Sequence, residues 1–170
     1  MAEDASAAEL EWRAGTPVSA RYGDPYWSLE DGLAEARYVH IEGAELARRM
    51  AGREVFQVCE LGFGAGLNLL AVLGCARAAG SRLRFWSVEA HPMTADQMAR
   101  AVSPWAELGE DAAALLDAWR TGGEGRRGDV TLQLESAEVE VAVGEAVARA
   151  AEAPLADAWL LDGFAPAKNP

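Results

Sequence analysis

The sequence predicts an α/β fold in which a doubly wound, mostly parallel sheet is covered by helices. Apolar segments of strand length alternate with helical segments of about 10 to 15 residues, and the connections are short. A glycine-rich turn at residues 60–66, ELGFGAG, directly follows the first buried strand segment. Strands that alternate with helices in this way form right-handed βαβ crossovers, and these produce a parallel sheet.

The first third of the chain is less regular. Residues 1–17 are acidic and rich in alanine, and they predict a flexible arm that precedes a domain spanning residues 18–170. Residues 23–28, GDPYWS, place turn residues around two aromatic side chains. Residues 35–50 fit either an amphipathic helix or a strand followed by a helix, and both possibilities stay open.

From residue 55 onward the alternation is regular. Gly80 should end the first helix of this part, because glycine readily adopts the left-handed conformation found at helix ends. Thr94 is a good N-cap for the second helix, and Asp96 lies in its first turn. The predicted elements are strands over 55–61, 83–88, 130–134 and 158–161, helices over 67–79, 94–102, 105–119 and 138–151, and a surface loop over 122–129.

Composition limits the class of protein. A chain of 170 residues with 51% hydrophobic residues fits one globular domain. The N-terminus has no basic region followed by an apolar stretch, so we expect no signal peptide and a cytoplasmic location. The longest apolar stretch, residues 61–76, is too short and too interrupted to span a bilayer, so we expect no membrane segment.

Charge and metal-ligand patterns narrow the possible partners. The net charge of -12 comes from 27 acidic and 15 basic residues. An acidic surface repels phosphate backbones, which counts against a nucleic-acid substrate unless another domain supplies positive charge. Cys59, Cys75, His40 and His91 form no spacing typical of metal ligands, so we expect no metal.

The turn after the first regular strand carries glycine at three alternate positions, Gly62, Gly64 and Gly66. A dinucleotide-binding fingerprint would need a further glycine at position 67, which is Leu67, and no GK[ST] phosphate loop follows. One interpretation is that the backbone passes close to a ligand. The alternative is a tight turn with close packing of helix against strand.

Two acidic residues favour a particular ligand. Glu60 precedes the glycines, and its carboxylate suits the amino group of the methionine tail of S-adenosylmethionine. Glu89 ends the next strand, where a carboxylate accepts hydrogen bonds from both ribose hydroxyls. The sequence therefore predicts S-adenosylmethionine as the cofactor.

The end of the last strand carries the best catalytic candidate. In a doubly wound sheet, ligands lie beyond the carboxyl ends of the strands, so LDGFAPAKNP should face the reactive end of the cofactor. The carboxylate of Asp162 would hold an amine and accept charge as a methyl group arrives, while Phe164 and Pro166 exclude water. The alternatives are an N-cap or turn role for Asp162 and ordinary packing for Phe164.

Four stretches give the chain a strong resemblance to a known family. In order, YWSLEDGLAEARYVHIEG, ELGFGAGLN, SVEAHPMT and DAWLLDGFAPAKNP resemble the methyltransferase module of the bifunctional, MnmC-type tRNA wobble-uridine modification proteins, a module that also exists as a stand-alone enzyme. The resemblance covers about residues 15–170. It implies a class I, Rossmann-like methyltransferase that transfers methyl from S-adenosylmethionine to the exocyclic amine of 5-aminomethyl-2-thiouridine in tRNA.

The resemblance also implies site residues by matching position. Glu89 would bind the ribose, and Asp162 with Phe164 the target amine, with Pro166 and Tyr26 completing the substrate pocket. The residues expected at the methionine end of the cofactor are Glu60, Gly62, Gly64, Gly66 and Asn68.

The chain departs from the family pattern in two places. Ala137 and Glu138 stand where the family shows Gly-Asp, so Glu138 is the expected contact to the adenine amino group. The sequence stops at Pro170, which predicts a domain that is incomplete at its C-terminus and an uncovered sheet edge. In fused relatives an FAD-dependent oxidase domain follows, which would help to bind tRNA.

Other functions compete with this one. The acidic surface mildly favours methylation of a small amine or a protein, since a cationic amine would be attracted. A third hypothesis is an inactive chain that only binds the cofactor or a partner. An NAD-linked oxidoreductase is the least favoured, because Leu67 breaks its fingerprint.

Overall fold

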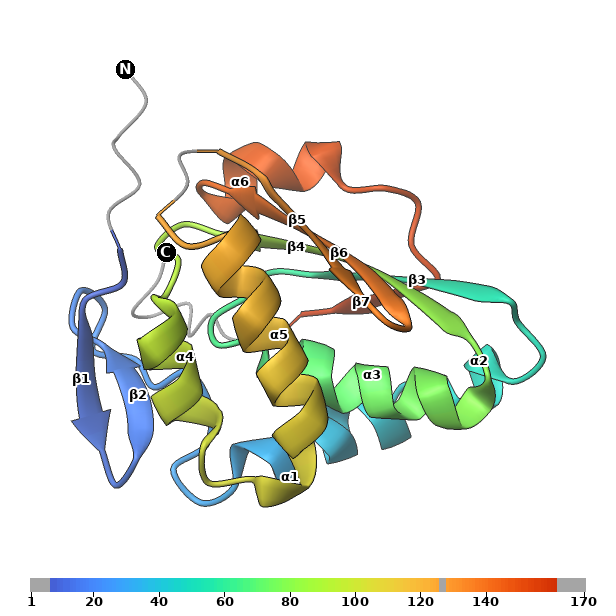
Figure 1. The fold of residues 1–170 in the computed structure, drawn as a ribbon, viewed down its shortest axis with the longest axis horizontal. Helices are drawn as coiled ribbons and strands as arrows, with labels where there is room; N and C mark the ends of the chain where they lie inside the picture. Colours follow the sequence, from blue (N-terminus) through green and yellow to red (C-terminus); the bar gives the residue numbers. More distant parts are fainter. Residues whose placement is uncertain (1–6, 126–127, 162–170) are drawn as a thin grey trace.

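The structure, a computed structural model, describes residues 7–125 and 128–161. Its strands are β1 (Leu10–Arg13), β2 (Thr16–Ser19), β3 (Val55–Glu60), β4 (Arg82–Glu89), β5 (Val130–Leu134), β6 (Ala137–Val143) and β7 (Ala158–Leu160). Its helices are α1 (Gly32–Ala36), α2 (Leu46–Met50), α3 (Leu67–Ala79), α4 (Ala95–Val102), α5 (Gly109–Gly122) and α6 (Ala146–Arg149), with a π-helical segment η1 (Arg37–Glu42) and 3-10 turns η2 (Ala106–Leu108) and η3 (Ala150–Glu152). Figure 1 shows these elements.

A central sheet of five strands organises the molecule. Its order is β5-β6-β4-β3-β7, and every neighbouring pair is parallel except β5 with β6. Helices α3 and α5 lie on one side of the sheet and α6 on the other (Figure 1). This arrangement confirms the predicted α/β class with a doubly wound, mostly parallel sheet.

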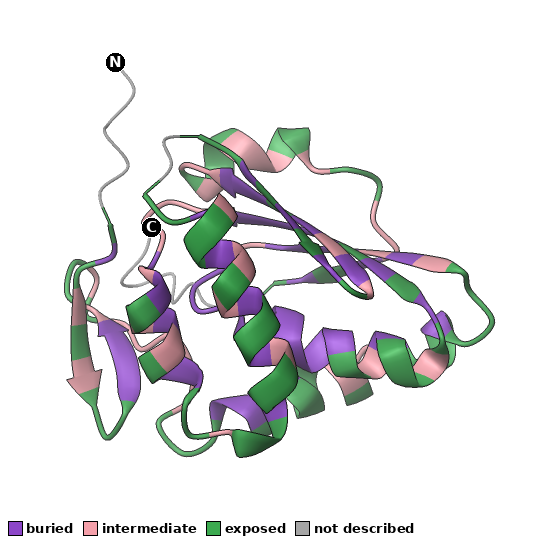
Figure 2. Cartoon of the chain, viewed as in Figure 1, coloured by how far each residue is buried: buried purple, intermediate pink, exposed green. Residues whose placement is uncertain are grey.

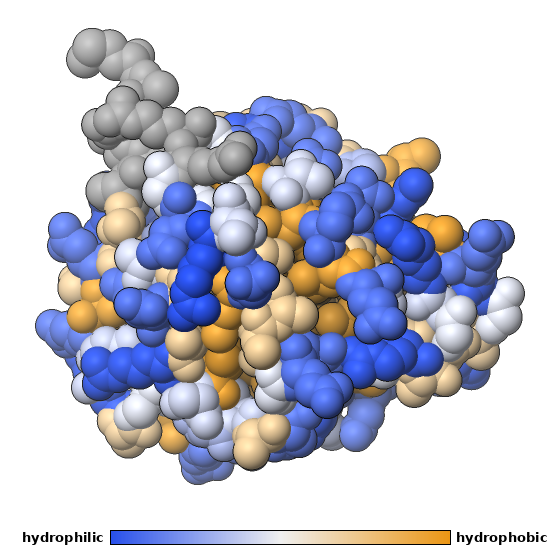
Figure 3. All heavy atoms as spheres, in the orientation of Figure 1, coloured by the Kyte–Doolittle hydropathy of each residue, from blue (hydrophilic) through white to orange (hydrophobic). Residues whose placement is uncertain are grey.

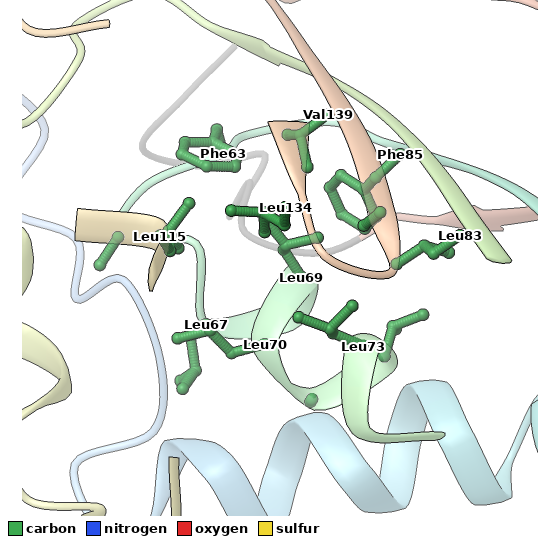
Figure 4. Packing of buried hydrophobic residues seen from close by; sticks show 14 of the residues in the cluster. Phe63, Leu67, Leu69, Leu70, Leu73, Leu83, Phe85, Leu115, Leu134 and Val139 are labelled. Carbon is green, nitrogen blue, oxygen red and sulfur yellow. The ribbon is translucent and has the colours of Figure 1, made fainter. Parts of the chain in front are cut away.

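Two apolar clusters lie on the two faces of the sheet. The larger one includes inward side chains of α3, α5 and the sheet, and Figure 4 shows Leu69 and Leu73 of α3 close to Phe85 of β4. The smaller cluster, around Trp86 and Cys59, packs near the α6 segment. The burial colours in Figure 2 follow this layering, with buried residues turned toward the sheet and exposed ones on the outer faces of the helices.

Several predicted elements are confirmed, and local sequence explains their ends. β3, α3, β4 and β7 occupy the predicted segments to within one or two residues. Helix α4 begins with a capping box in which the Thr94 hydroxyl accepts a hydrogen bond from the Gln97 backbone and the Gln97 side chain accepts one from the Thr94 backbone. The backbone N–H of Gly80 closes the C-terminus of α3.

The predicted helix over residues 138–151 is wrong for its first half. Residues 137–143 form β6, which pairs with β5 through a tight turn at residues 135–136. Ala137, Val139 and Val141 are buried, and the intervening glutamates are not. Because alternate side chains of a strand point to the same face, Ala137, Val139 and Val141 can all be buried. The stabilisation from this burial outweighs the helix propensity of alanine and glutamate.

The N-terminal third contains a hairpin followed by a helical segment. The last part of the expected flexible arm, residues 10–17, lies in the antiparallel hairpin β1–β2. The guanidinium of Arg100 stacks over the Trp12 ring at 4.0 Å from its centroid, which joins the hairpin to α4. Residues 35–50 are helical throughout most of their length and contain no strand.

The surface in the view of Figure 3 is largely hydrophilic, with a strip of apolar side chains across its middle. Within residues 7–125 and 128–161, no helix has both the length and the apolar character needed to cross a membrane.

Candidate functional site

A pocket of about 310 Å³ lies where the parallel strands reach their carboxyl ends. Its volume falls in the range of about 300 to 1,000 Å³ that small-molecule sites occupy. One wall comes from the ends of β3, β4 and β6, and the other from the hairpin and its flanking segments. The lining residues are 62, 64, 68, 88–91 and 144–146 on the first wall, and 7–9, 19, 21, 22 and 24–26 on the second.

The three alternate glycines serve two purposes. Gly62, Gly64 and Gly66 have φ values of 97°, 54° and 75°, a region that side chains disfavour. Gly62 and Gly64 line the pocket, as the ligand interpretation requires. A Cβ atom at Gly66 would lie 2.8 Å from Cδ2 of Leu115, so this glycine is needed for packing. Each of the two interpretations therefore applies to a different part of the loop.

Glu89 ends β4 and lies on the pocket wall. Its Oε2 accepts a hydrogen bond from the backbone N–H of Gly64 at 2.8 Å, and its Oε1 accepts one from the N–H of His91 at 2.8 Å. A carboxylate oxygen has capacity for a second hydrogen bond, so both oxygens can also accept from a ligand. The carboxyl group thus ties the glycine loop to the strand end beside the pocket.

The environment of Glu89 predicts a pH dependence of stability. Burial raises the pKa of the Glu89 carboxyl above its ordinary value, and the backbone hydrogen bonds from His91 and Gly64 offset this only in part. The folded chain therefore binds this proton more tightly than the unfolded chain does. Its stabilising contribution should be complete below the ordinary carboxyl pKa and should be lost as the pH rises through the raised pKa.

Urea unfolding of the wild type and of Glu89→Gln, which cannot titrate, measures this contribution between about pH 4 and pH 8. We expect the free energy of unfolding of the wild type, relative to that of the variant, to fall as the pH rises. A difference that stays constant or increases with pH would contradict the assigned direction.

Tyr26, predicted to bind substrate, lies on the opposite wall. A Cβ atom at Gly64 would lie only 3.0 Å from Cδ1 of Tyr26, so the ring sits directly against the glycine loop. Burial and the nearby Glu89 raise the pKa of the Tyr26 hydroxyl above its ordinary value. The hydroxyl therefore stays neutral at physiological pH and remains able to donate a hydrogen bond.

Glu60, predicted to contact the cofactor, is only 1% exposed and is absent from the pocket lining. Asn68, from the first turn of α3, is on the wall instead, and its amide donates a hydrogen bond to Glu60. The structure thus brings Asn68, Gly62, Gly64, Glu89 and Tyr26 to one pocket, with Glu60 beneath it.

The predicted adenine contact, Glu138, is far from this pocket. It lies at the start of β6, where it pairs in register with Arg84, and the pocket lies at the other end of that strand. Its Oε2 is 3.8 Å from Nε of Arg84. The sequence pattern predicted a strand over residues 130–134 followed by a helix from residue 138. It therefore placed the end of the strand, and the acidic residue expected after it, too early in the chain. β6 ends before Gly144 and Glu145, which do line the pocket.

The remaining predicted site residues, Asp162, Phe164 and Pro166, lie outside the described residues. β7 runs parallel to β3 and aligns Leu160 with Glu60, so the described chain ends at the same sheet edge as the pocket. Within the described ranges, no three His, Cys, Asp or Glu side chains gather closely enough to hold a metal ion.

Apart from Tyr26, sequence reasoning missed the second wall of the pocket. Arg21 and Tyr22 follow the hairpin, and the Tyr22 ring lies 6.4 Å from that of His91, centroid to centroid. Ala8 is buried and donates its N–H to the carbonyl of Pro92. The available signal was the alternation in residues 10–19, but the acidic, alanine-rich composition around it masked this signal.

The chain is similar in sequence to one protein family model and to several proteins named MnmC. Residues 106–170 match the model of a family described as S-adenosyl-L-methionine-dependent methyltransferase. The chain is 46% identical, over 98% of its length, to the tRNA 5-methylaminomethyl-2-thiouridine biosynthesis bifunctional protein MnmC of Caulobacter sp. (strain K31). It is 48% identical, over 95% of its length, to the protein of the same name from Caulobacter vibrioides. The aligned parts make up only 29% and 28% of those two proteins.

A solved structure shares the fold. The crystal structure of MNMC2 from Aquifex aeolicus superimposes with a TM-score of 0.69 and 25% sequence identity. The match covers 96% of this chain and 52% of that one.

Proposed function

We propose that this chain, which is similar over nearly its whole length to MnmC proteins and over residues 106–170 to a methyltransferase family, methylates the exocyclic amine of 5-aminomethyl-2-thiouridine at the tRNA wobble position, with S-adenosylmethionine as the methyl donor. The observation that carries the proposal is sequence similarity over nearly the whole chain. The position of the pocket supports it, because cofactors of doubly wound folds bind at the carboxyl ends of the strands.

The pocket fits the proposed cofactor in its donor set. Glu89 would accept hydrogen bonds from the ribose hydroxyls while keeping its two backbone partners. Gly62 and Gly64 leave room for the ligand beside the backbone, and Asn68 would meet the methionine end. Glu145, the N-cap residue of α6 just after β6, replaces Glu138 as the proposed contact to the adenine amino group. When bound, S-adenosylmethionine would supply a sulfonium methyl group with a good leaving group.

The residues beyond β7 complete the proposal. Asp162 would accept a hydrogen bond from the target amine and balance the positive charge that develops there. Phe164, Pro166 and Tyr26 would position the base and exclude water. The cytoplasmic location and the involvement of an FAD-dependent oxidase domain or partner also remain part of the proposal.

Methyl transfer to tRNA provides the test. The chain is incubated with labelled S-adenosylmethionine and tRNA that carries 5-aminomethyl-2-thiouridine, and the modified nucleoside is identified by mass spectrometry. We expect Asp162→Asn to lower kcat by about 10- to 30-fold, since it replaces a hydrogen bond to a charged group by a neutral one. Binding of S-adenosylhomocysteine should be unchanged in this variant.

Two controls make the result specific. Fully modified tRNA should accept no methyl group, and free small amines should accept none either. Equal labelling of small amines with and without tRNA would instead support the amine-methylating alternative. A folded chain that binds the cofactor but methylates neither would contradict the proposed activity.

A further inference from the structure

A buried hydrogen-bonded cluster lies below the floor of the pocket. Glu60 is 1% exposed, and its Oε1 accepts a hydrogen bond from Nδ2 of Asn68 at 3.0 Å. Its Oε2 accepts one from Oγ of Ser87, a fully buried residue, at 2.7 Å. The cluster joins the end of β3, the first turn of α3 and β4. Burying a carboxylate is costly unless its oxygens are hydrogen bonded, so these contacts are required for Glu60 to be tolerated there.

The chemistry of the carboxylate fixes the orientation of Asn68. An ionised carboxylate only accepts hydrogen bonds, so Asn68 must turn its NH2 group toward Glu60. The other end of the amide is a carbonyl oxygen, which only accepts. Asn68 lines the pocket and Glu60 does not. A cation in the pocket would therefore meet an oriented acceptor on Asn68.

We propose that Glu60 is a positioning residue that acts on the amino group of the ligand through Asn68. Glu60 holds the Asn68 amide in the one orientation that offers its oxygen to the ammonium group of the methionine tail. This inference rests on the proposed function only in requiring a ligand with that tail. It replaces the expected direct contact between Glu60 and the cofactor.

Glu60→Gln distinguishes the two roles. A glutamine that donates its Nε2 to the Ser87 hydroxyl accepts from Asn68 with its Oε1, and in this arrangement it keeps the orientation of Asn68 while removing the charge. Positioning through Asn68 therefore predicts that Glu60→Gln keeps the affinity to within about threefold, whereas direct charge pairing predicts a loss of about tenfold or more.

The experiment measures two ligands by calorimetry. S-adenosylhomocysteine has the amino-acid tail, and 5′-methylthioadenosine lacks it. For Glu60→Ala and Asn68→Ala we expect a loss of about tenfold for S-adenosylhomocysteine and less than threefold for 5′-methylthioadenosine. The double variant Glu60→Ala/Asn68→Ala should lose no more affinity for S-adenosylhomocysteine than Asn68→Ala alone. The effects of two residues are not additive when one residue acts through the other.

The outcomes are separable. An equal loss in Glu60→Gln and Glu60→Ala, or additive losses in the double variant, would overturn the positioning role. Equal losses for both ligands would show a merely structural effect and would also overturn it. If Glu60→Ala does not fold, as judged by circular dichroism, the two separate variants Glu60→Gln and Asn68→Ala still distinguish positioning through Asn68 from direct charge pairing. A wild-type chain that binds neither ligand would contradict the cofactor assignment in the proposed function, whereas binding without methyl transfer leaves the positioning role intact.

Discussion

Glu89→Ala should weaken the binding of S-adenosylhomocysteine by at least about 100-fold, the largest loss expected from a single change in the pocket wall. Hydrogen bonds to a charged group contribute about 1.5 to 3 kcal/mol each, and two ribose hydroxyls would lose theirs. The variant also removes the acceptor for the backbone N–H groups of Gly64 and His91, so the loop loses its side-chain contact with β4 and keeps the backbone hydrogen bonds to Val88. Calorimetric titration measures the dissociation constant.

The matched control is Glu138→Ala. Glu138 is also an acidic residue of the parallel sheet, but it lies at the opposite end of its strand from the pocket. We expect a change in affinity of less than about twofold, since the ion pair that it forms with Arg84 is exposed to solvent. Comparable losses in the two variants would contradict the assigned location of the ligand.

Trp119→Ala should lower the free energy of unfolding by about 3 to 5 kcal/mol. Trp119 is 1% exposed, its Nε1 donates a hydrogen bond to the carbonyl of Met93 at 3.0 Å, and its ring stacks on Phe63 at 5.4 Å. The change opens a large cavity and leaves that carbonyl without its partner. For a chain of this size the melting temperature should fall by about 6 to 20 °C.

The matched control here is Tyr38→Ala, because Tyr38 is also aromatic but is 72% exposed. Its effect on the free energy of unfolding should stay within about 0.5 kcal/mol. Urea unfolding of both variants measures the two values. A loss below about 1.5 kcal/mol for Trp119→Ala would show that the core relaxes around the missing ring.

The central part of the fold was predictable because its elements carry strong local signals. The run of residues 55–61 fits a strand buried on both faces, and Thr94 and Gly80 mark helix ends by chemistry that needs no tertiary context. β6 was missed because alanine and glutamate favour helices in isolation. Its pairing with β5 and β4 decides its conformation, and such pairing is not visible in composition.

The site was predictable only where it follows the strands. Gly62, Gly64 and Glu89 come directly after strand segments, so their position at the carboxyl edge follows from topology. Glu60 was expected at the pocket and is absent from its lining, and sequence does not show which side of a strand end faces a pocket. Glu145 lines the pocket but was not among the predicted residues, since β6 was predicted as a helix and the expected acidic residue, Glu138, lies at the opposite end of that strand.

The β1–β2 hairpin makes the ligand site depend on a part of the chain that lies outside the central sheet. A molecule with the hairpin displaced would lose the second wall of the pocket, so its measured affinity would be the intrinsic affinity multiplied by the fraction of molecules with the hairpin in place. By the same equilibrium, a bound ligand would increase the fraction of molecules with the hairpin in place. Substitutions at contacts that hold the hairpin, such as Arg100 with Trp12, would thus change the ligand affinity although these residues do not contact the ligand.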